Sequence, residues 1–348
     1  MSPFIPIILI TGLILGTSIT LTSSHWLLAW MGLEINTLAI IPLMTKHHHP
    51  RATEAATKYF LTQATAATTL LFAATTNAWI SGQWEIQQMT HPLPVTLATL
   101  SLALKMGLAP LHAWLPELLQ GLDLLTGLVL STWQKLAPFA LLTQILPTTP
   151  TLFIALGVAS TLVGGWGGLN QTQLRKILAY SSIAHLGWMI LILQYSPPLA
   201  YLSLLLYFVM TFAPFMTFKL NKSLNINSLA TSSTKNPVLT ALLLLSLLSL
   251  GGLPPLSGFM PKLLILQELT QQNLPLIATL AALSSLLSLY FYLRLSHAMA
   301  LTTFPNSPLG TTPWRLLPTH KTLPLTLAIS TTIILFPHTP TTLALLGL

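Results

Sequence analysis

Apolar segments long enough to cross a lipid bilayer follow one another along almost the whole chain, and only short polar turns separate them. A spanning helix needs about 20 apolar residues, because each residue adds about 1.5 Å and the hydrocarbon core is about 30 Å thick. Only 6% of the residues are charged, against about 25% in a soluble domain. The pattern predicts an all-α polytopic membrane protein without a soluble domain.

Hydropathy predicts eleven spanning helices, at about 3–22, 25–44, 56–79, 92–120, 123–146, 149–170, 174–194, 197–220, 237–269, 274–298 and 322–346. The first lacks the basic region of a signal peptide and the Arg-rich pattern of a transit peptide, so we expect a true span. We expect one membrane domain over 1–348, with repeats at about 1–146 and 149–298 and a final helix at about 322–346. Because each repeat has five helices, the two would have inverted orientations, as in many transporters.

Basic residues fall on one side of this topology. Of the 14 Lys and Arg residues, three lie deep inside predicted spans, and the remaining eleven lie in loops or at helix ends, all on the side that holds the N-terminus. By the positive-inside rule, that side is the cytoplasm or an organelle matrix. The net charge of +8 therefore indicates membrane orientation and not nucleic-acid binding.

Four charged residues lie deep inside the spans, away from the helix ends. Glu34, Lys105 and Lys135 are each within about one residue of the midpoint of a span, and Lys262 is off centre in its own. A charge at the bilayer centre costs roughly 2.5–3.5 kcal/mol on insertion scales, and such residues are typical of proton and ion pathways. Two alternatives stay open, namely lysine side chains that snorkel to the interface and a structural hydrogen-bonding role for Glu34.

Helix-breaking residues accompany the three lysines. Pro110 removes a backbone hydrogen bond beside Lys105, and Pro138 removes one beside Lys135. A cluster of glycines and prolines directly precedes Lys262. Unpaired backbone groups at membrane depth are tolerated only where protein or water meets them, so the breaks predict a hydrated interior path. The broken helix is the fourth of each repeat, and we expect Lys105 and Lys262 to correspond.

These ionisable groups form a candidate proton relay. In the five-helix repeat, Glu34 of the second helix is matched by His185 near the midpoint of the seventh. Burial favours the neutral amine of a lysine, whereas a nearby carboxylate favours the ammonium. A lysine that gains or loses Glu34 as a partner can therefore change its protonation. Histidine exchanges protons near neutral pH, which suits His185 to a relay. No motif in this chain supplies the energy that pumping needs.

Motifs for redox or hydrolytic chemistry are missing from the sequence. The lack of cysteine excludes disulfides, thiolate metal sites and Cys-ligated iron–sulfur clusters. The glycine cluster at 164–168 follows no strand and favours helix packing over dinucleotide binding. The consecutive histidines at 47–49 cannot all face one metal, and His112 with His185 is too small a set to favour haem. Five tryptophans near span ends are expected to be interface anchors: Trp26, Trp79, Trp84, Trp114 and Trp314.

The most distinctive motifs are KYFLTQATAATTLL (58–71), LALKMGLAPLHAWLPELLQG (102–121), STWQKLAPF (131–139), LNQTQLRKILAYSSIAHLGWM (169–189) and SLGGLPPLSGFMPKLLILQEL (249–269). Together they resemble the mitochondrial NADH dehydrogenase subunit 2 family, which are antiporter-like membrane subunits of respiratory complex I. The resemblance covers essentially the whole chain. It implies a proton relay made of the intramembrane charges and of the histidines in matching motifs, namely Glu34, Lys105, Lys135, Lys262, His185 and His112.

The resemblance also implies a place for the chain in a larger enzyme, NADH:ubiquinone reductase. This chain would translocate protons, while other subunits bind NADH, FMN, iron–sulfur clusters and ubiquinone, and it would hold no cofactor or metal itself. The implied partners are other membrane-arm subunits of complex I and lipids, with cardiolipin as a candidate, and no nucleic acid. The implied location is the mitochondrial inner membrane, with the N-terminus and the basic loops on the matrix side.

Two other functions stay open on the sequence. A standalone monovalent cation/proton antiporter uses the same kind of fold, and sodium- or potassium-linked proton exchange by the chain alone would favour it. A structural membrane scaffold would use the buried charges only to hold helices together. Normal assembly and normal pumping after neutral replacement of Lys135 or Glu34 would favour the scaffold.

Overall fold

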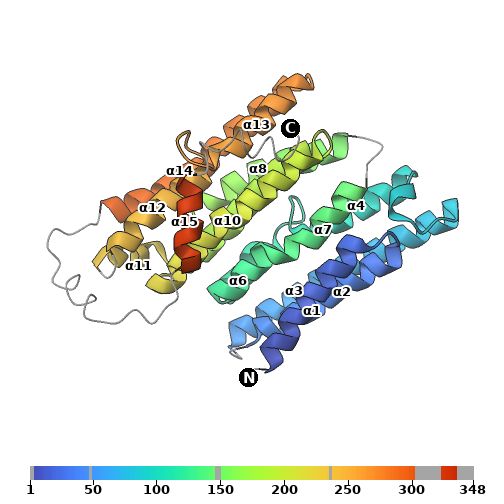
Figure 1. Ribbon diagram of the computed structural model, residues 1–348, viewed down its shortest axis with the longest axis horizontal. Coiled ribbons are helices and arrows are strands. Elements are labelled where there is room, and N and C mark those ends of the chain that lie inside the picture. The colour runs from blue at the N-terminus through green and yellow to red at the C-terminus, as the bar shows by residue number, and fades with distance from the viewer. Residues whose placement is uncertain (1–3, 47–48, 146–149, 235–236, 302–322, 335–348) are drawn as a thin grey trace. The chain divides into compact units, whose positions relative to one another are not determined.

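The computed structural model describes residues 4–46, 49–145, 150–234, 237–301 and 323–334 (Figure 1). Over these residues every regular element is a helix, and two isolated β-bridges join short connections. The predicted all-α class is thus confirmed for the described residues. Six of the described helices are long and apolar enough to cross a membrane, namely α1 (Phe4–Thr22), α2 (Trp26–Met44), α8 (Thr151–Gly168), α9 (Leu174–Leu193), α10 (Pro197–Asn221) and α14 (Pro275–Ala300).

The chain forms two compact units, Met1–Leu156 and Gly157–Leu348, and the boundary falls inside α8. The first unit also contains α3 (Pro50–Ser81), η1 (Ile86–Gln88), α4 (Pro92–Met106), α5 (Trp114–Gly121), α6 (Leu124–Ser131) and α7 (Trp133–Gln144). In this unit α2 packs against α1 and α3, α3 contacts α4 and α5, and α7 contacts α1, α2 and α4. These contacts surround a small interior space with helices from distant parts of the sequence.

Helix α3 is the longest helix of the first unit. Its 32 residues extend over about 48 Å, so it is longer than a bilayer core is thick. Near its start, Lys58 lies 2.9 Å from both Glu54 and Glu117. The hydrogen bond from Lys58 lowers the pKa of the Glu54 carboxyl below its ordinary value. The second contact joins α3 to α5.

The Lys58–Glu117 pair is exposed, so its loss is expected to change the stability of the protein little. Water screens exposed ion pairs, and many contribute nothing measurable to stability. Glu117→Gln should therefore leave the thermal unfolding midpoint of the protein almost unchanged. A large fall in that midpoint would show that this ion pair is needed to hold α5 against α3.

The predicted fourth span, 92–120, is interrupted in the structure. Helix α4 ends at Gly107, which has a φ of 79° and donates its N–H to the carbonyls of Ala103 and Leu104. A glycine in this left-handed conformation is a common helix terminator. The chain resumes as a helix at α5, and the segment between them carries the backbone groups that a continuous helix would have paired.

The predicted fifth span, 123–146, is also divided, but not where we expected. The break lies at Thr132, between α6 and α7, whereas Pro138 lies inside α7. The expectation of a break at Pro138 was wrong. The Thr132 hydroxyl donates to the Leu128 carbonyl at 2.7 Å, and the backbone N–H of Thr132 donates to the same carbonyl. A threonine that competes in this way for a helix carbonyl can bend the helix.

The second unit contains α8 from Gly157 on, α9, α10, α11 (Ile226–Ala230), η2 (Thr231–Thr234), α12 (Pro237–Gly251), α13 (Phe259–Gln271), α14 and α15 (Leu323–Ile334). Helix α9 contacts α10, α13 and α14, and it is buried over most of its length. The predicted ninth span is interrupted between α12 and α13. The final predicted span is described only over α15, and the rest of it lies outside the described residues.

Candidate functional site

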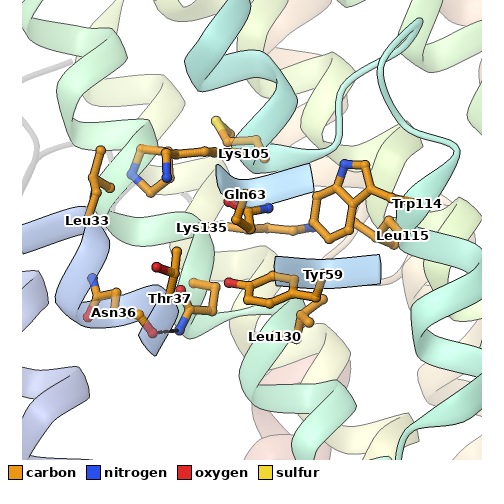
Figure 2. A pocket seen from close by; sticks show the side chains of 13 residues that line it. Leu33, Asn36, Thr37, Tyr59, Gln63, Lys105, Trp114, Leu115, Leu130 and Lys135 are labelled. Atoms are coloured by element: carbon orange, nitrogen blue, oxygen red, sulfur yellow. Dashed lines mark hydrogen bonds between the residues drawn. The ribbon is translucent and has the colours of Figure 1, made fainter. Parts of the chain in front are cut away.

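Lys105 and Lys135 line one cavity inside the first unit (Figure 2). The cavity has a volume of about 10 Å³ open to a water-sized group, which is close to the space that one water needs. The other lining residues come from α2, α3, α6, α7, the end of α4 and the start of α5: Leu33, Asn36, Thr37, Tyr59, Gln63, Met106, Trp114, Leu115, Leu130, Gln134 and Pro138. Helices far apart in the sequence thus enclose two of the predicted site residues.

Lys105 lies in the last turn of α4 and is 6% exposed. Its Nζ has no hydrogen-bond partner among the described residues. The carbonyls at the end of α4 have other donors, because Gly107 and Leu108 donate to Ala103 and the Trp114 indole donates to Leu104 at 3.1 Å. The Lys105 ammonium is left facing the cavity.

Lys135 is 2% exposed and lies in the first turn of α7, directly after the break at Thr132. This position is at the positive end of the α7 dipole, where a cation is disfavoured. Lys105 is at the negative end of α4, where a cation is favoured. The two lysines of one cavity therefore stand at helix ends of opposite polarity.

Glu34 is half-buried in α2 and lies beside the cavity without lining it. Its carboxylate interacts electrostatically with the Lys105 ammonium and with the hydroxyl of Tyr59. The Thr37 hydroxyl approaches Glu34 Oε2 at 3.5 Å. The structure thus brings Lys105 and Lys135 together at one cavity, with Glu34 beside it.

Lys262 is 7% exposed in the first turn of α13. Its Nζ donates at 2.8 Å to the carbonyl of Gly251, the last residue of α12, where the negative end of a helix dipole favours a cation. Lys262 follows its helix break, whereas Lys105 precedes its own. The expected correspondence therefore does not extend to these two lysines residue by residue.

The two candidate histidines have different surroundings. His185 is half-buried in α9, and its ring centroid lies 5.6 Å from that of Tyr207 in α10. His112 lies in the break between α4 and α5, with Nδ1 3.2 Å from the carbonyl oxygen of Pro110, and it does not line the cavity. His185 and Lys262 belong to the second unit, and His112 to the first.

Comparison with known proteins decides the family. A family model described as NADH:quinone oxidoreductase/Mrp antiporter, TM, matches residues 23–288, and one described as NADH dehydrogenase subunit 2 C-terminus matches 289–343. The NADH-ubiquinone oxidoreductase chain 2 of Tetraodon nigroviridis is 70% identical over 348 residues, with 100% of both chains covered. The chain belongs to the NADH-ubiquinone oxidoreductase chain 2 family.

Chains in two solved structures are also similar to this chain 2 family member. A chain of respiratory complex I from Thermus thermophilus with bound aureothin is 28% identical, with a TM-score of 0.84 over 100% of this chain and 80% of that one. A chain of the Mrp complex from Dietzia sp. DQ12-45-1b is 16% identical, with a TM-score of 0.81 over 97% of this chain and 76% of that one. The second likeness shows a shared fold.

The cavity residues of α3 in this chain 2 member had no role in the sequence reasoning. Tyr59 and Gln63 are spaced i, i+4 on α3, so a helical reading of the KYFLTQ segment puts both on one face. Trp114 was expected to be an interface anchor, which was wrong, because the break folds it back onto the end of α4. Trp26 is 1% exposed and buried as well, whereas Trp314 lies outside the described residues.

The Trp114 indole should have a measurable structural role. Trp114→Phe keeps an aromatic side chain, but the Leu104 carbonyl loses its indole donor, which is expected to cost about 1 kcal/mol of stability. Trp79→Phe is the matched control, because Trp79 is 89% exposed. Equal thermal unfolding midpoints for the two variants would contradict a role for this hydrogen bond.

No group of three or more His, Cys, Asp or Glu side chains that could hold a metal occurs among the described residues. Within that part of the chain, charged and polar groups gather around Lys105 and Lys135. A carboxylate, two buried lysines and a water-sized space provide groups that can bind and release protons.

Proposed function

We propose that this chain is the proton-translocating chain 2 subunit of respiratory NADH:ubiquinone oxidoreductase and that its buried ionisable side chains carry the protons. The observation that supports the relay most is the cavity shared by Lys105 and Lys135 beside Glu34. The family membership of the chain supports its assignment to this enzyme.

Glu34 acts as the electrostatic control of the first unit in this mechanism. When Glu34 is charged, it favours the ammonium form of Lys105. When Glu34 is neutralised or moved away, the buried Lys105 ammonium loses that support and releases its proton. Lys135 lines the same cavity and is the nearest candidate to receive the proton. One proton then moves between two amines for each change at Glu34.

The second unit supplies further proton-binding groups. Lys262 is held at the C-terminal end of α12, and His185 lies against Tyr207 in the buried helix α9. His112, in the first break, is half-exposed and is placed to exchange protons between the path and its surroundings. The histidines can act as relays because imidazole gains and loses protons near neutral pH.

Redox chemistry in other subunits supplies the energy for proton translocation. NADH, FMN, iron–sulfur clusters and ubiquinone bind there, and the partners of this chain are membrane-arm subunits and lipids, among them cardiolipin. We place the chain in the mitochondrial inner membrane, with the N-terminus and basic loops on the matrix side. Eleven spans in two inverted repeats, within a single membrane domain, account for the one-sided basic residues.

Glu34→Gln tests this function. The substitution keeps the size of the side chain and removes its charge, so Lys105 should lose its electrostatic partner. We expect complex I that contains the variant chain to assemble and to translocate fewer protons per NADH oxidised. The ratio is measured in proteoliposomes from the acidification of the lumen and the loss of NADH absorbance.

The same vesicles separate the rival functions. An unchanged proton-to-NADH ratio would favour a structural role for Glu34. Proton exchange driven by a sodium or potassium gradient, from this chain reconstituted alone, would favour a standalone antiporter.

A further inference from the structure

Gln63 of α3 lines the lysine cavity and has no part in the relay described above. Its side chain is 3% exposed, and its Nε2 has no hydrogen-bond partner among the described residues. Figure 2 shows Gln63 between the labelled Lys105 and Lys135. A buried amide donor thus faces the same space as the two lysines.

Lys105 Nζ and Gln63 Nε2 share one deficiency. Both are buried donors without an acceptor in the described structure. A donor left in this state is unfavourable, so buried polar groups are nearly always paired, often with an ordered water. A water has two lone pairs and can accept from both nitrogens, and the cavity volume of about 10 Å³ is close to that of one such site.

We propose that Gln63 binds a single ordered water in this cavity and that the water carries the proton between Lys105 and Lys135. This inference rests on the proposed function. The Lys105 ammonium gives one proton to the water oxygen, and the water gives one of its own protons to the neutral amine of Lys135. The water is regenerated and one proton has moved. The amide of Gln63 neither gains nor loses a proton.

An amide is suited to hold such a water. The transfer leaves the water with a hydrogen toward Lys105 and a lone pair toward Lys135, so the water must turn before the next proton can pass. Rotation of the Gln63 amide by 180° exchanges its N–H donors for its carbonyl acceptor, so the same side chain can bind either orientation. An apolar side chain of equal length, such as methionine, would leave the water without this partner.

Asn77 provides a matched control on the same helix. It is also a fully buried amide of α3, 0% exposed, but it donates to the Gln83 carbonyl at the end of the helix and does not line the cavity. Asn77→Leu removes a buried amide from α3 and leaves the proposed water untouched. A comparison of the two variants separates water binding from helix packing.

The experiment compares proton translocation by reconstituted complex I that contains Gln63→Met, Gln63→Glu, Asn77→Leu or Lys135→Met. We expect Gln63→Met to slow translocation roughly fivefold, the equivalent of one hydrogen bond of about 1 kcal/mol. Gln63→Glu should restore it in part and add a new ionisation to the pH profile, because the carboxyl can hold the water but titrates. Asn77→Leu should translocate protons at nearly the unmodified rate.

Different failures have different meanings. Normal translocation by Lys135→Met would remove Lys135 from the relay and so overturn the part of the proposed function on which the water proposal rests. If that variant is impaired while Gln63→Met is normal, or if Asn77→Leu and Gln63→Met are equally impaired, the water proposal alone is wrong. Should Gln63→Met fail to assemble, a map of unmodified complex I at water-resolving resolution decides. Density within hydrogen-bond distance of Lys105 Nζ and the Gln63 amide supports the proposal, and its lack there overturns it.

Discussion

Lys135→Met is expected to cause the largest functional loss of any single substitution in the first unit. Methionine fills nearly the same volume in the core around Lys135, which is 2% exposed, but it cannot bind a proton. Proton transfer through this chain should slow by on the order of 10²-fold, the scale that positioned acid–base groups supply. The measurements are the rate of NADH oxidation and the protons translocated per NADH in proteoliposomes that contain the whole complex.

Lys219→Met is the control for this loss. Lys219 is an exposed lysine in the last turn of α10, so its replacement removes the same charge from a place outside the proposed path. We expect near-normal pumping with Lys219→Met and normal amounts of assembled complex with both variants. Normal pumping with Lys135→Met would remove this residue from the relay.

Gly252→Ala is expected to have the largest effect in the second unit, through Lys262. Gly252 has a φ of 81°, and a Cβ at this position would lie 2.8 Å from Lys262 Nζ and 3.1 Å from its Cδ and Cε. The lysine is flexible, so it will move before the backbone does and will lose its bond to the Gly251 carbonyl. Pumping should fall sharply, while the stability loss stays near the roughly 1–2 kcal/mol of a left-handed alanine.

Gly82→Ala is the matched control for that substitution. Gly82 has a φ of 71° at the end of α3, but a Cβ there would meet nothing within 4 Å. Both alanine variants should therefore unfold at similarly lowered temperatures, and only Gly252→Ala should lose pumping. Equal pumping by the two variants would show that the position of Lys262 at the end of α12 does not matter for function.

Apolar length, glycine and proline determined what could be predicted from the sequence. Segments of about 20 apolar residues predicted helices, and charges deep inside them predicted burial, which is observed for Lys105, Lys135 and Lys262. The interruptions near Pro110 and before Lys262 followed from residues that cannot continue a helix. These features depend on the chemistry of neighbouring residues, so they can be recognised in the sequence.

Features that depend on tertiary contacts were not predictable. At the break the Thr132 hydroxyl donates to the Leu128 carbonyl, but many threonines make such a bond inside unbroken helices, so the residue type alone does not mark this position. Trp114 lies near the end of its span in the sequence, and only the fold of the break turns it inward. Likewise, the carbonyl that binds Lys262 and the water-sized space beside Gln63 exist only once separate helices have packed.

The central claim is that Lys105 and Lys135 serve one proton path, and a double-mutant cycle tests it most directly. Complex I that contains Lys105→Met, Lys135→Met or both is compared for protons translocated per NADH oxidised. Groups that act as one unit give strongly non-additive losses. We therefore predict that the double variant pumps no worse than the more impaired single variant. A double variant whose loss equals the product of the two single losses would contradict a shared path.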